Sequence, residues 1–252
     1  MSDNTVITPE GAIQLENTPM KAWEQADYAL SNGLGRVLLY GLPGTGKSYY
    51  ALNYHTNNQE TYKLVCTQDM TDSDLIGMYK PTTVNGQMQL TFHEGVAIKA
   101  WRTGGRLVVD EIDKVNGDIE SRLMSLIDTH TSSVWQNPDT GETIKPHPDF
   151  SVVATMNGEP EDLGRAIQDR LVVQIEINEP HPDAIDSLPK YLRDMAYSMA
   201  SRTGKDRYSL RNFVEFSKLY ERTNDLNRSA QVCLPRIQEQ LVDALSLSKV
   251  EA

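Results

Sequence analysis

Residues 41–48 read Gly-Leu-Pro-Gly-Thr-Gly-Lys-Ser, which is a complete G-x-x-x-x-G-K-[ST] loop. The residues before it, 36–40, are mostly apolar and suit a short buried strand. The residues after it, 49–55, contain no helix breaker and can form a helix. Strand, glycine-rich loop and helix is the order in which this motif binds phosphate. The stretch therefore predicts an α/β fold of the P-loop NTPase kind.

The chemistry of this loop follows from its residue types. Its glycines let the backbone curl so that N–H groups point at phosphate oxygens, and the helix N-terminus adds partial positive charge. Lys47 can reach the β- and γ-phosphates, and Ser48 can ligate Mg²⁺. ATP and Mg²⁺ are therefore the expected cofactors; a glycine turn that merely precedes a helix would not explain Lys47 and Ser48 in register. The predicted cofactor-binding residues are Gly41, Pro43, Gly44, Thr45, Gly46, Lys47, Ser48 and Tyr49.

A second segment predicts hydrolysis as well as binding. Residues 107–111 read Leu-Val-Val-Asp-Glu, an apolar run that ends in two carboxylates and is typical of a strand buried on both faces. Ligands of open α/β sheets lie at the carboxyl ends of strands, where Asp110 and Glu111 would emerge. We expect Asp110 to join Ser48 in holding Mg²⁺ and Glu111 to polarise the attacking water. Taken alone, an Asp-Glu pair would equally fit a solvated acidic turn.

Composition limits the other classes of function. The 252 residues carry a formal net charge of −11 and no dense basic run, so nucleic acid is not the expected partner. Two cysteines are too few for a disulfide framework, and the five histidines show no metal-ligand spacing. No apolar run is long enough to span a bilayer, and the N-terminus lacks the pattern of a secretory signal. Residence in the cytoplasm is the expectation.

The order of predicted elements indicates a parallel sheet covered by helices. Five strand candidates, 36–41, 62–66, 106–110, 150–155 and 171–177, alternate with helical stretches. A hairpin is expected at 78–92, where apolar and polar residues alternate beyond Asn85-Gly86, and another at 133–145 around a Pro-Asp-Thr-Gly turn. Three prolines between 180 and 189 precede an all-helical pattern. We therefore expect an α/β core over 1–180 and a helical lid domain over 181–252.

At this point the residues match a known family. The chain resembles the AAA+ ATPases of the MoxR and dynein-related group over nearly its whole length. The phosphate loop and the acidic strand alone would fit many P-loop proteins, but the ordered set is specific. The matching segments are 41–48, 74–81, 107–113, 152–157, 163–171 and 209–211.

The resemblance implies roles for several residues whose neighbouring sequence alone does not decide their role. Asn157 resembles the first sensor, whose amide bonds the γ-phosphate and the attacking water; an ordinary turn before Gly158 is the alternative. Arg170 resembles the arginine finger that acts on nucleotide held by the neighbouring subunit, with Arg165 as the weaker candidate. Arg211 resembles the second sensor, which reaches from the lid to the γ-phosphate. Without the resemblance, both Arg170 and Arg211 would be interpreted as solvated helix residues.

An arginine that acts in trans implies a homo-oligomeric ring, most often a hexamer. Little chain precedes residue 30 and none follows the lid, so effector function is expected on a separate polypeptide, in relatives often a protein with a von Willebrand A domain. No aromatic–hydrophobic–glycine pore loop is present, which argues against processive unfolding. The leading hypothesis is a ring ATPase that remodels or matures a protein complex. The alternatives are a nucleic-acid motor and a non-catalytic, nucleotide-switched scaffold.

Overall fold

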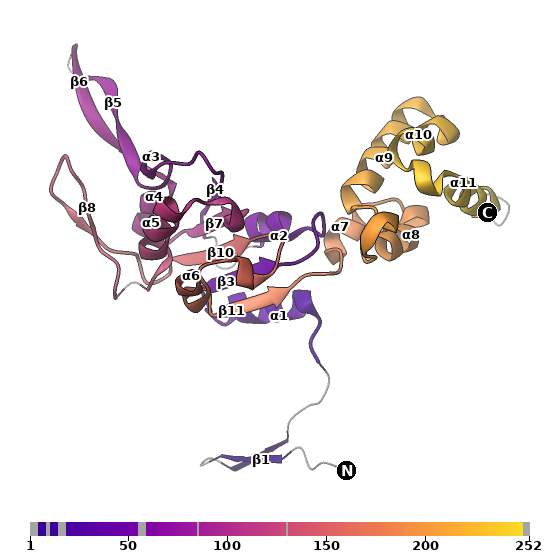
Figure 1. Ribbon diagram of the computed structural model, residues 1–252, viewed down its shortest axis with the longest axis horizontal. Coiled ribbons are helices and arrows are strands. Elements are labelled where there is room, and N and C mark those ends of the chain that lie inside the picture. Colours follow the sequence, from indigo (N-terminus) through magenta and orange to yellow (C-terminus); the bar gives the residue numbers. More distant parts are fainter. Residues whose placement is uncertain are drawn as a thin grey trace.

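The computed structural model describes residues 5–8, 11–14, 19–54, 59–84, 86–129 and 131–248. At its centre lies a sheet of five parallel strands in the order β11-β3-β10-β7-β4 (Figure 1). Its strands are β3 (Arg36–Tyr40), β4 (Thr61–Val65), β7 (Arg106–Asp110), β10 (Ser151–Thr155) and β11 (Val173–Glu176). This confirms the predicted five-stranded sheet. All five carboxyl ends point to the same edge, so residues that follow different strands meet there.

Helices cover both faces of the sheet because its strands are apolar on both sides. On β3, Val37 and Leu39 face one helical layer, while Leu38 faces the other. The first layer consists of α1 (Ala22–Ser31) and α2 (Lys47–Asn53), and the second of α4 (Val96–Thr103), α5 (Gly117–Ile127) and α6 (Arg165–Arg170). Helix α1 was missed in the sequence, where the residues before 30 were given no structural role. It is part of the core, since Trp23, Ala26 and Leu30 are buried against the sheet.

The predicted hairpin at 78–92 is confirmed and slightly longer than expected. It consists of β5 (Gly77–Val84) and β6 (Gln87–Glu94), which pair antiparallel and project from the body of the molecule (Figure 1). The hairpin is inserted between α3 (Asp72–Leu75) and α4. Gly77 fixes its base: it has φ +123°, and a Cβ there would lie 2.1 Å from the His93 carbonyl oxygen. Asn85, in the predicted turn, lies outside the described residues.

The second hairpin, predicted at 133–145, is confirmed as a short pair of strands. It consists of β8 (Trp135–Gln136) and β9 (Thr143–Ile144), between α5 and β10. Helix α5, which precedes this hairpin, ends at Ile127, because Asp128 adopts an extended backbone with ψ 179°. Asp128 therefore leaves the helix and is free to face other elements.

The residues beyond 180 are helical, as the sequence pattern indicates. The helices are α7 (Pro182–Asp186), α8 (Lys190–Ala200), α9 (Leu210–Thr223), α10 (Leu226–Cys233) and α11 (Gln238–Ser248). We call residues 182–248 the helical segment. Its buried core, which includes Leu192, Phe213, Phe216 and Leu241, shares no residue with the cores on the two faces of the sheet. The division near residue 180 stays a prediction, and the separate cores support it.

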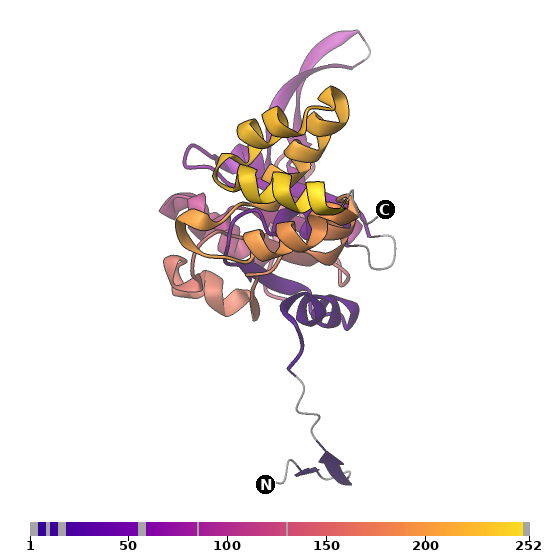
Figure 2. The same ribbon diagram turned by 90° about the vertical axis from the view of Figure 1, so that its right-hand side faces the viewer.

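At the other end of the chain, β1 (Thr5–Thr8) and β2 (Gly11–Gln14) form an antiparallel pair that lies apart from the remaining elements (Figures 1 and 2). Within the described part of the chain, no helix combines the length and apolarity that a bilayer crossing requires.

Candidate nucleotide site

The glycine-rich loop connects β3 to α2 at the carboxyl edge of the sheet. Gly41, Gly44 and Gly46 have φ of +107°, +70° and +108°, a backbone region that other residues rarely adopt. Thr45 is fully buried and donates a hydrogen bond to the Leu42 carbonyl oxygen at 3.1 Å. The loop is thus curled tightly and held from within, as a phosphate cradle requires.

Lys47 extends back across this loop. Its ammonium donates to the carbonyl oxygens of Gly41 at 3.0 Å and Leu42 at 2.7 Å, and to Asn157 Oδ1 at 3.1 Å. Burial, reinforced by the charge of Arg207, lowers the pKa of Lys47 from 10.5 to about 8, although Asp110 and Asp113 oppose the shift. Lys47 therefore joins the end of β3 to the end of β10.

Asp110, at the end of β7, is the centre of a second polar cluster. Its Oδ1 accepts hydrogen bonds from Ser48 Oγ at 2.5 Å and from Thr155 Oγ1 at 2.6 Å, and its Oδ2 lies 3.1 Å from Lys63 Nζ. Burial pushes the pKa of Asp110 upward, but the hydrogen bonds from Ser48, Thr155 and Lys63 outweigh it and leave the pKa below its usual value. The carboxyl group is therefore ionised and fixed beside Ser48.

These oxygens fit a magnesium ion. Mg²⁺ in nucleotide sites takes one or two protein oxygens and completes its shell with water and phosphate. Ser48 Oγ and the Asp110 carboxylate are such a pair of hard oxygen donors, side by side at the start of α2. Among the residues that the structure describes, no group of three or more His, Cys, Asp or Glu side chains could hold a metal by itself. A metal here would depend on the phosphates of its substrate.

Glu111 follows Asp110 at the same edge, in an unusual backbone conformation. Its φ is 58° and its ψ is 48°, which is the left-handed region. Its N–H donates to Thr155 Oγ1 at 3.4 Å, and the 3₁₀ turn η1 (Ile112–Lys114) begins directly after it. Such strain in a residue other than glycine is concentrated at functional sites. The turn away from β7 sets Glu111 apart from Asp110, which supports separate roles for the two carboxylates.

Tyr49 and Asn157 lie at the margins of the site. Asn157 follows β10 and is exposed, and its side-chain oxygen accepts a hydrogen bond from Lys47. Tyr49, on α2, is also exposed, and its ring centre lies 6.4 Å from that of His181. The structure thus brings Lys47, Ser48, Asp110 and Asn157 together at one edge, with Tyr49 at its side.

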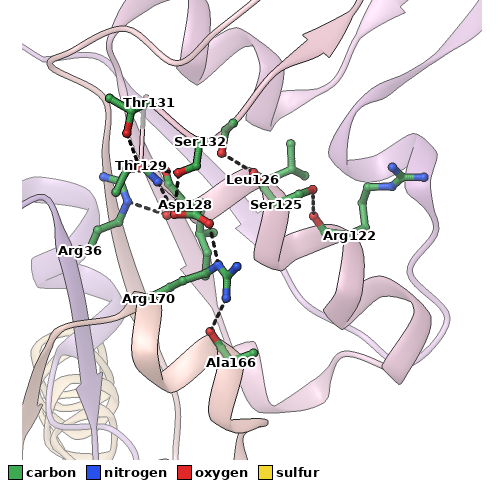
Figure 3. Close-up of polar contacts among 12 residues, drawn as sticks. Arg36, Arg122, Ser125, Leu126, Asp128, Thr129, Thr131, Ser132, Ala166 and Arg170 are labelled. Carbon is green, nitrogen blue, oxygen red and sulfur yellow. Dashed lines mark hydrogen bonds and ion pairs between the residues drawn. The ribbon is translucent and has the colours of Figure 1, made fainter.

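Arg170 lies outside this cluster. It is on α6, where its Nε donates to Asp128 Oδ2 at 3.0 Å and its Nη1 donates to the Ala166 carbonyl oxygen at 2.8 Å (Figure 3). Asp128 also accepts from the Thr129 N–H and the Ser132 hydroxyl, and its pKa is lowered because these bonds and Arg170 outweigh its burial. Arg36 donates to the Asp128 carbonyl oxygen at 2.8 Å, so this junction is anchored to β3.

The other two arginines singled out in the sequence are exposed. Arg165 begins α6, and Arg211 lies in the first turn of α9. Within the described residues, neither side chain makes a hydrogen bond or ion pair. The described structure therefore shows no polar bond from the side chain of Arg165 or Arg211 to the phosphate loop.

Several residues near the site were not predicted. Thr155 could have been found, because it is a polar residue that ends a buried strand beside Asp110. Lys63, His181 and Arg207 carried no local signal, since they reach the site only through strand pairing and the packing of the helical segment. Of these, Arg207 donates from Nη2 to the Pro43 carbonyl oxygen of the loop, and the His181 N–H donates to the Thr45 carbonyl oxygen at 2.8 Å.

Comparison with solved structures agrees with this architecture. The crystal structure of NtrX from Brucella abortus in complex with ATP aligns with a TM-score of 0.50 and 14% identity, over 82% of this chain and 53% of that one. A second NtrX crystal structure from the same organism aligns with a TM-score of 0.52 and 17% identity, over 84% of this chain and 52% of that one. At such identities the likeness shows a shared fold.

Relatives among curated proteins match the chain in part. An uncharacterized protein of Staphylococcus haemolyticus is 33% identical over 131 residues, which are 51% of this chain and 49% of the relative. An uncharacterized protein of Staphylococcus saprophyticus is 31% identical over 123 residues, which are 48% and 46% of the two chains. The chain thus matches about half the length of the curated relatives.

The family itself is shown by a sequence model. The model of the AAA domain of the dynein-related subfamily matches residues 36–171, which is more than half of the chain. This stretch includes the phosphate loop, the acidic end of β7, Asn157 and helix α6. The chain therefore belongs to the dynein-related subfamily of the AAA+ ATPases.

Proposed function

We propose that this chain is a Mg²⁺-dependent ATPase that works in a homo-oligomeric ring, most simply a hexamer, and remodels or matures a protein complex in the manner of MoxR relatives. The observation that carries the proposal is the convergence of Lys47, Ser48, Asp110 and Asn157 at the ends of β3, β7 and β10. A cation for phosphate, an oxygen pair for metal and an amide for the γ-phosphate are the parts that phosphoryl transfer requires.

Different residues of the site serve different steps of ATP hydrolysis. Lys47 and the loop N–H groups bind the phosphates, and Ser48 with Asp110 holds the metal, which would neutralise developing charge on the phosphate oxygens. Glu111 polarises the attacking water. Asn157 orients that water and the γ-phosphate. An ionised Asp110, fixed by Ser48 and Thr155, is ready for the metal without rearrangement.

The contacts of Arg170 support a ring. Arg170 is tied to Asp128 and Ala166 and not to the phosphate loop of its own subunit, and about a third of its side chain is exposed (Figure 3). Asp128 orients the guanidinium without covering it. An arginine held in this way can serve nucleotide bound to a neighbouring subunit, which is the trans arrangement of arginine fingers.

The hairpins support a protein as the partner. We call β5–β6 together with residues 133–145 the arm. In the register of β5–β6, Tyr79, Phe92, Leu90 and Met88 share one face. At the base of this face, the Phe92 ring lies 5.6 Å from Trp135 of the second hairpin. Farther out, Leu90 is 67% exposed and Met88 is 80% exposed, and apolar side chains in such a position suit contact with another protein.

Arg102 of α4 joins the two hairpins at their base. Its guanidinium donates to both carboxylate oxygens of Glu94, at the end of β6, and to both of Glu142, beside β9. The Phe92 N–H also donates to Asp139 Oδ2 at 2.6 Å. Because the first hairpin leads through α4 to β7 and the second leads to β10, movement of the arm would reach Asp110 and Asn157. The expected partner is a separate protein in the cytoplasm, for which a von Willebrand A domain protein is the favoured class.

Capture of the partner from native cells tests this proposal. A Glu111→Gln chain, which should hold ATP without hydrolysing it, is compared with a Glu111→Gln chain that also carries Met88→Ser and Leu90→Ser. A protein retained in an ATP-dependent manner by the first and lost from the second supports partner remodelling through the arm. Retention of DNA or RNA instead, with ATP turnover stimulated by it, would replace the proposal with a nucleic-acid motor.

A further inference from the structure

The carboxylate of Asp128 joins two parts of the molecule (Figure 3). Its Oδ2 accepts a hydrogen bond from Arg170 Nε at 3.0 Å. Its Oδ1 accepts from the Thr129 N–H at 2.7 Å and from the Ser132 hydroxyl at 3.2 Å. Asp128 directly follows α5, and Ser132 directly precedes the arm. One oxygen therefore serves α6, and the other serves the stretch of chain that leads into the arm.

The backbone of Asp128 is fixed to the sheet by Arg36. The Arg36 guanidinium donates to the carbonyl oxygens of Ile127 at 2.6 Å, Asp128 at 2.8 Å and Phe150 at 3.0 Å. Arg36 begins β3 and Phe150 directly precedes β10, so this junction lies at the amino edge of the sheet. The phosphate loop follows the opposite end of β3, roughly 15 Å away for a strand of this length at about 3.3 Å per residue. Arg170 is thus held at the edge opposite to the phosphate loop of its own subunit.

The guanidinium of Arg170 is held by part of its donors only. Nε donates to Asp128 and Nη1 donates to the Ala166 carbonyl oxygen, whereas Nη2 has no hydrogen-bond partner among the residues that the structure describes. Because the guanidinium is planar, two bonds fix its orientation and leave Nη2 for a group on another molecule. Loss of either bond would free the plane to turn.

The arm begins beside the bonds of Asp128. Ser133, its first residue, is only 5% exposed and donates from Oγ to the Ser125 carbonyl oxygen at 2.7 Å. Two residues farther on, the Trp135 ring lies 5.6 Å from Phe92 of the first hairpin. Both hairpins of the arm are therefore connected by short contacts to the turn that the Asp128 carboxylate stabilises.

We propose that Asp128 is a positioning residue that couples Arg170 to the arm, so that the arm of one subunit controls ATP hydrolysis in the neighbouring subunit. Because the backbone of Asp128 is fixed, a shift of Ser132 with the arm acts on the carboxylate and turns the guanidinium bonded to it. A misplacement of about 1 Å can cost about 100-fold in rate. This inference rests on the ring and the trans arginine of the proposed function. It differs from the route along the chain to β7 and β10, which leads to the subunit's own nucleotide.

Asp128→Asn is the variant that separates the two bonds. An amide has one acceptor oxygen, so it can serve the Thr129 N–H or Arg170 Nε but not both. We expect turnover to fall roughly 10- to 100-fold, while ATP affinity, measured in the Glu111→Gln background, stays unchanged. The control is Asp186→Asn, which removes a carboxylate paired with Arg193 at 2.8 Å in the helical segment and should leave turnover unchanged.

Two combinations distinguish positioning from a structural role. Asp128→Asn added to Arg170→Ala should cause no further loss of turnover, because Asp128 acts only through Arg170. In mixed rings, an Asp128→Asn subunit beside a Glu111→Gln subunit has an intact nucleotide site served by an intact Arg170, so its turnover should recover. Additive losses, or no recovery in mixed rings verified by mass, would mean that Asp128 supports its own subunit only.

Coupling to the arm has a readout that needs no turnover. Coupling between two sites is reciprocal, so ATP engaged by Arg170 of a neighbour must in turn affect the arm of that neighbour. In Glu111→Gln rings, ATP should slow hydrogen exchange in residues 132–136. The slowing should disappear when Asp128→Asn or Arg170→Ala is added, although ATP remains bound. Slowing that persists without Arg170, or no slowing in Glu111→Gln rings, would overturn the coupling.

Failure of this inference can be told apart from failure of the proposed function. Parent turnover in Arg170→Ala would remove the trans arginine itself, and the role of Asp128 with it. A large loss in Arg170→Ala with parent turnover in Asp128→Asn would leave the trans arginine in place and remove only the role of Asp128.

Discussion

The carboxyl edge of the sheet and the outer part of the arm depart from the usual distribution of side chains in opposite ways. At the edge, Lys47 and Asp110 are charged and buried, and each is hydrogen-bonded within the chain. On the arm, Met88 and Leu90 are apolar and exposed. Folded proteins bury charge only where partners compensate it, and they expose contiguous apolar surface mainly where another molecule covers it.

The two regions suit different kinds of ligand. Polar groups held in fixed positions favour a small charged ligand such as a nucleotide with its metal. An exposed apolar stripe on a projecting hairpin favours a large partner. We therefore expect substitutions at the edge to change ATP turnover strongly and substitutions at the arm to change it little.

The largest loss of turnover is expected for Glu111→Gln. Glutamine keeps the shape of the side chain but cannot polarise water as a carboxylate does, so turnover should fall by roughly 10⁴-fold, the upper range for general-base catalysis. Binding of ATP should be preserved, because Lys47, Ser48 and Asp110 are untouched. Single-turnover hydrolysis and ATP titration measure the two separately. The control is Glu239→Gln, an exposed isosteric change on α11. Turnover near the parent value would remove Glu111 from the mechanism.

Arg170→Ala should have the next largest effect, about a 10³-fold loss of turnover with ATP binding nearly intact, as for other arginine fingers. Arg165→Ala, an exposed change at the start of the same helix, tests the weaker candidate and should leave turnover close to the parent value. Mixing gives the sharper test. Subunits with Arg170→Ala and subunits with Glu111→Gln are each inactive, but mixed rings contain interfaces where an intact Glu111 meets an intact Arg170. Absence of any recovery in mixed rings verified by mass would place the action of Arg170 within its own subunit.

Much of the fold could be predicted because it depends on local patterns. Apolar runs such as 107–109 indicate a strand buried on both faces without knowledge of the residues that cover it. The alternation from 87 to 92 indicates a hairpin without knowledge of what the hairpin contacts. The residues that follow β3, β7 and β10 could be placed together because the carboxyl ends of parallel strands meet at one edge. Asp110 was placed in this way, whereas Lys47 was found from the glycine-rich motif and Asn157 from the resemblance to the family.

The residues that sequence alone did not find depend on contacts between distant segments. Lys63 reaches Asp110 only because β4 pairs with β7 in one particular register. Arg207 meets Pro43 across a long stretch of chain, through the packing of the helical segment on the loop. Arg102 joins two hairpins that are separated by helices and by β7. No local pattern encodes these contacts, because each is decided by tertiary packing.

A smaller effect is expected from pH, through Lys47. The folded state lowers the pKa of Lys47 to about 8, so without nucleotide its ammonium loses its proton as pH rises through that value. Phosphate needs the charged form, so ATP affinity should be nearly full at pH 6.5, about 2-fold weaker at pH 8 and about 10-fold weaker at pH 9, which follows from one proton per site. Titrations with ATP in the Glu111→Gln background, from pH 6.5 to pH 9, measure this.

Arg207→Gln is the internal control for the pH dependence. Removal of the Arg207 charge should move the midpoint for Lys47 upward, because that charge is the second cause of its lowered pKa after burial. An ATP affinity that stays constant up to pH 9 in the parent protein would contradict the lowered pKa of Lys47. A midpoint that does not move in Arg207→Gln would show that the charge of Arg207 does not lower the pKa of Lys47.

The smallest effect on turnover is expected from Arg102→Ala, at the base of the arm. The ion pairs of Arg102 with Glu94 and Glu142 are partly exposed, and such pairs contribute only about 0–1 kcal/mol to the free energy of unfolding. Basal turnover and Tm should therefore stay close to those of the parent. Hydrogen exchange should nevertheless increase together in 77–94 and 135–144, because the same guanidinium holds both hairpins. Arg122→Ala removes a comparable exposed pair with Asp72 and should leave both hairpins protected. Increased exchange in one hairpin alone would show that the hairpins move independently, and a large loss of basal turnover would show that the arm is part of the catalytic edge after all.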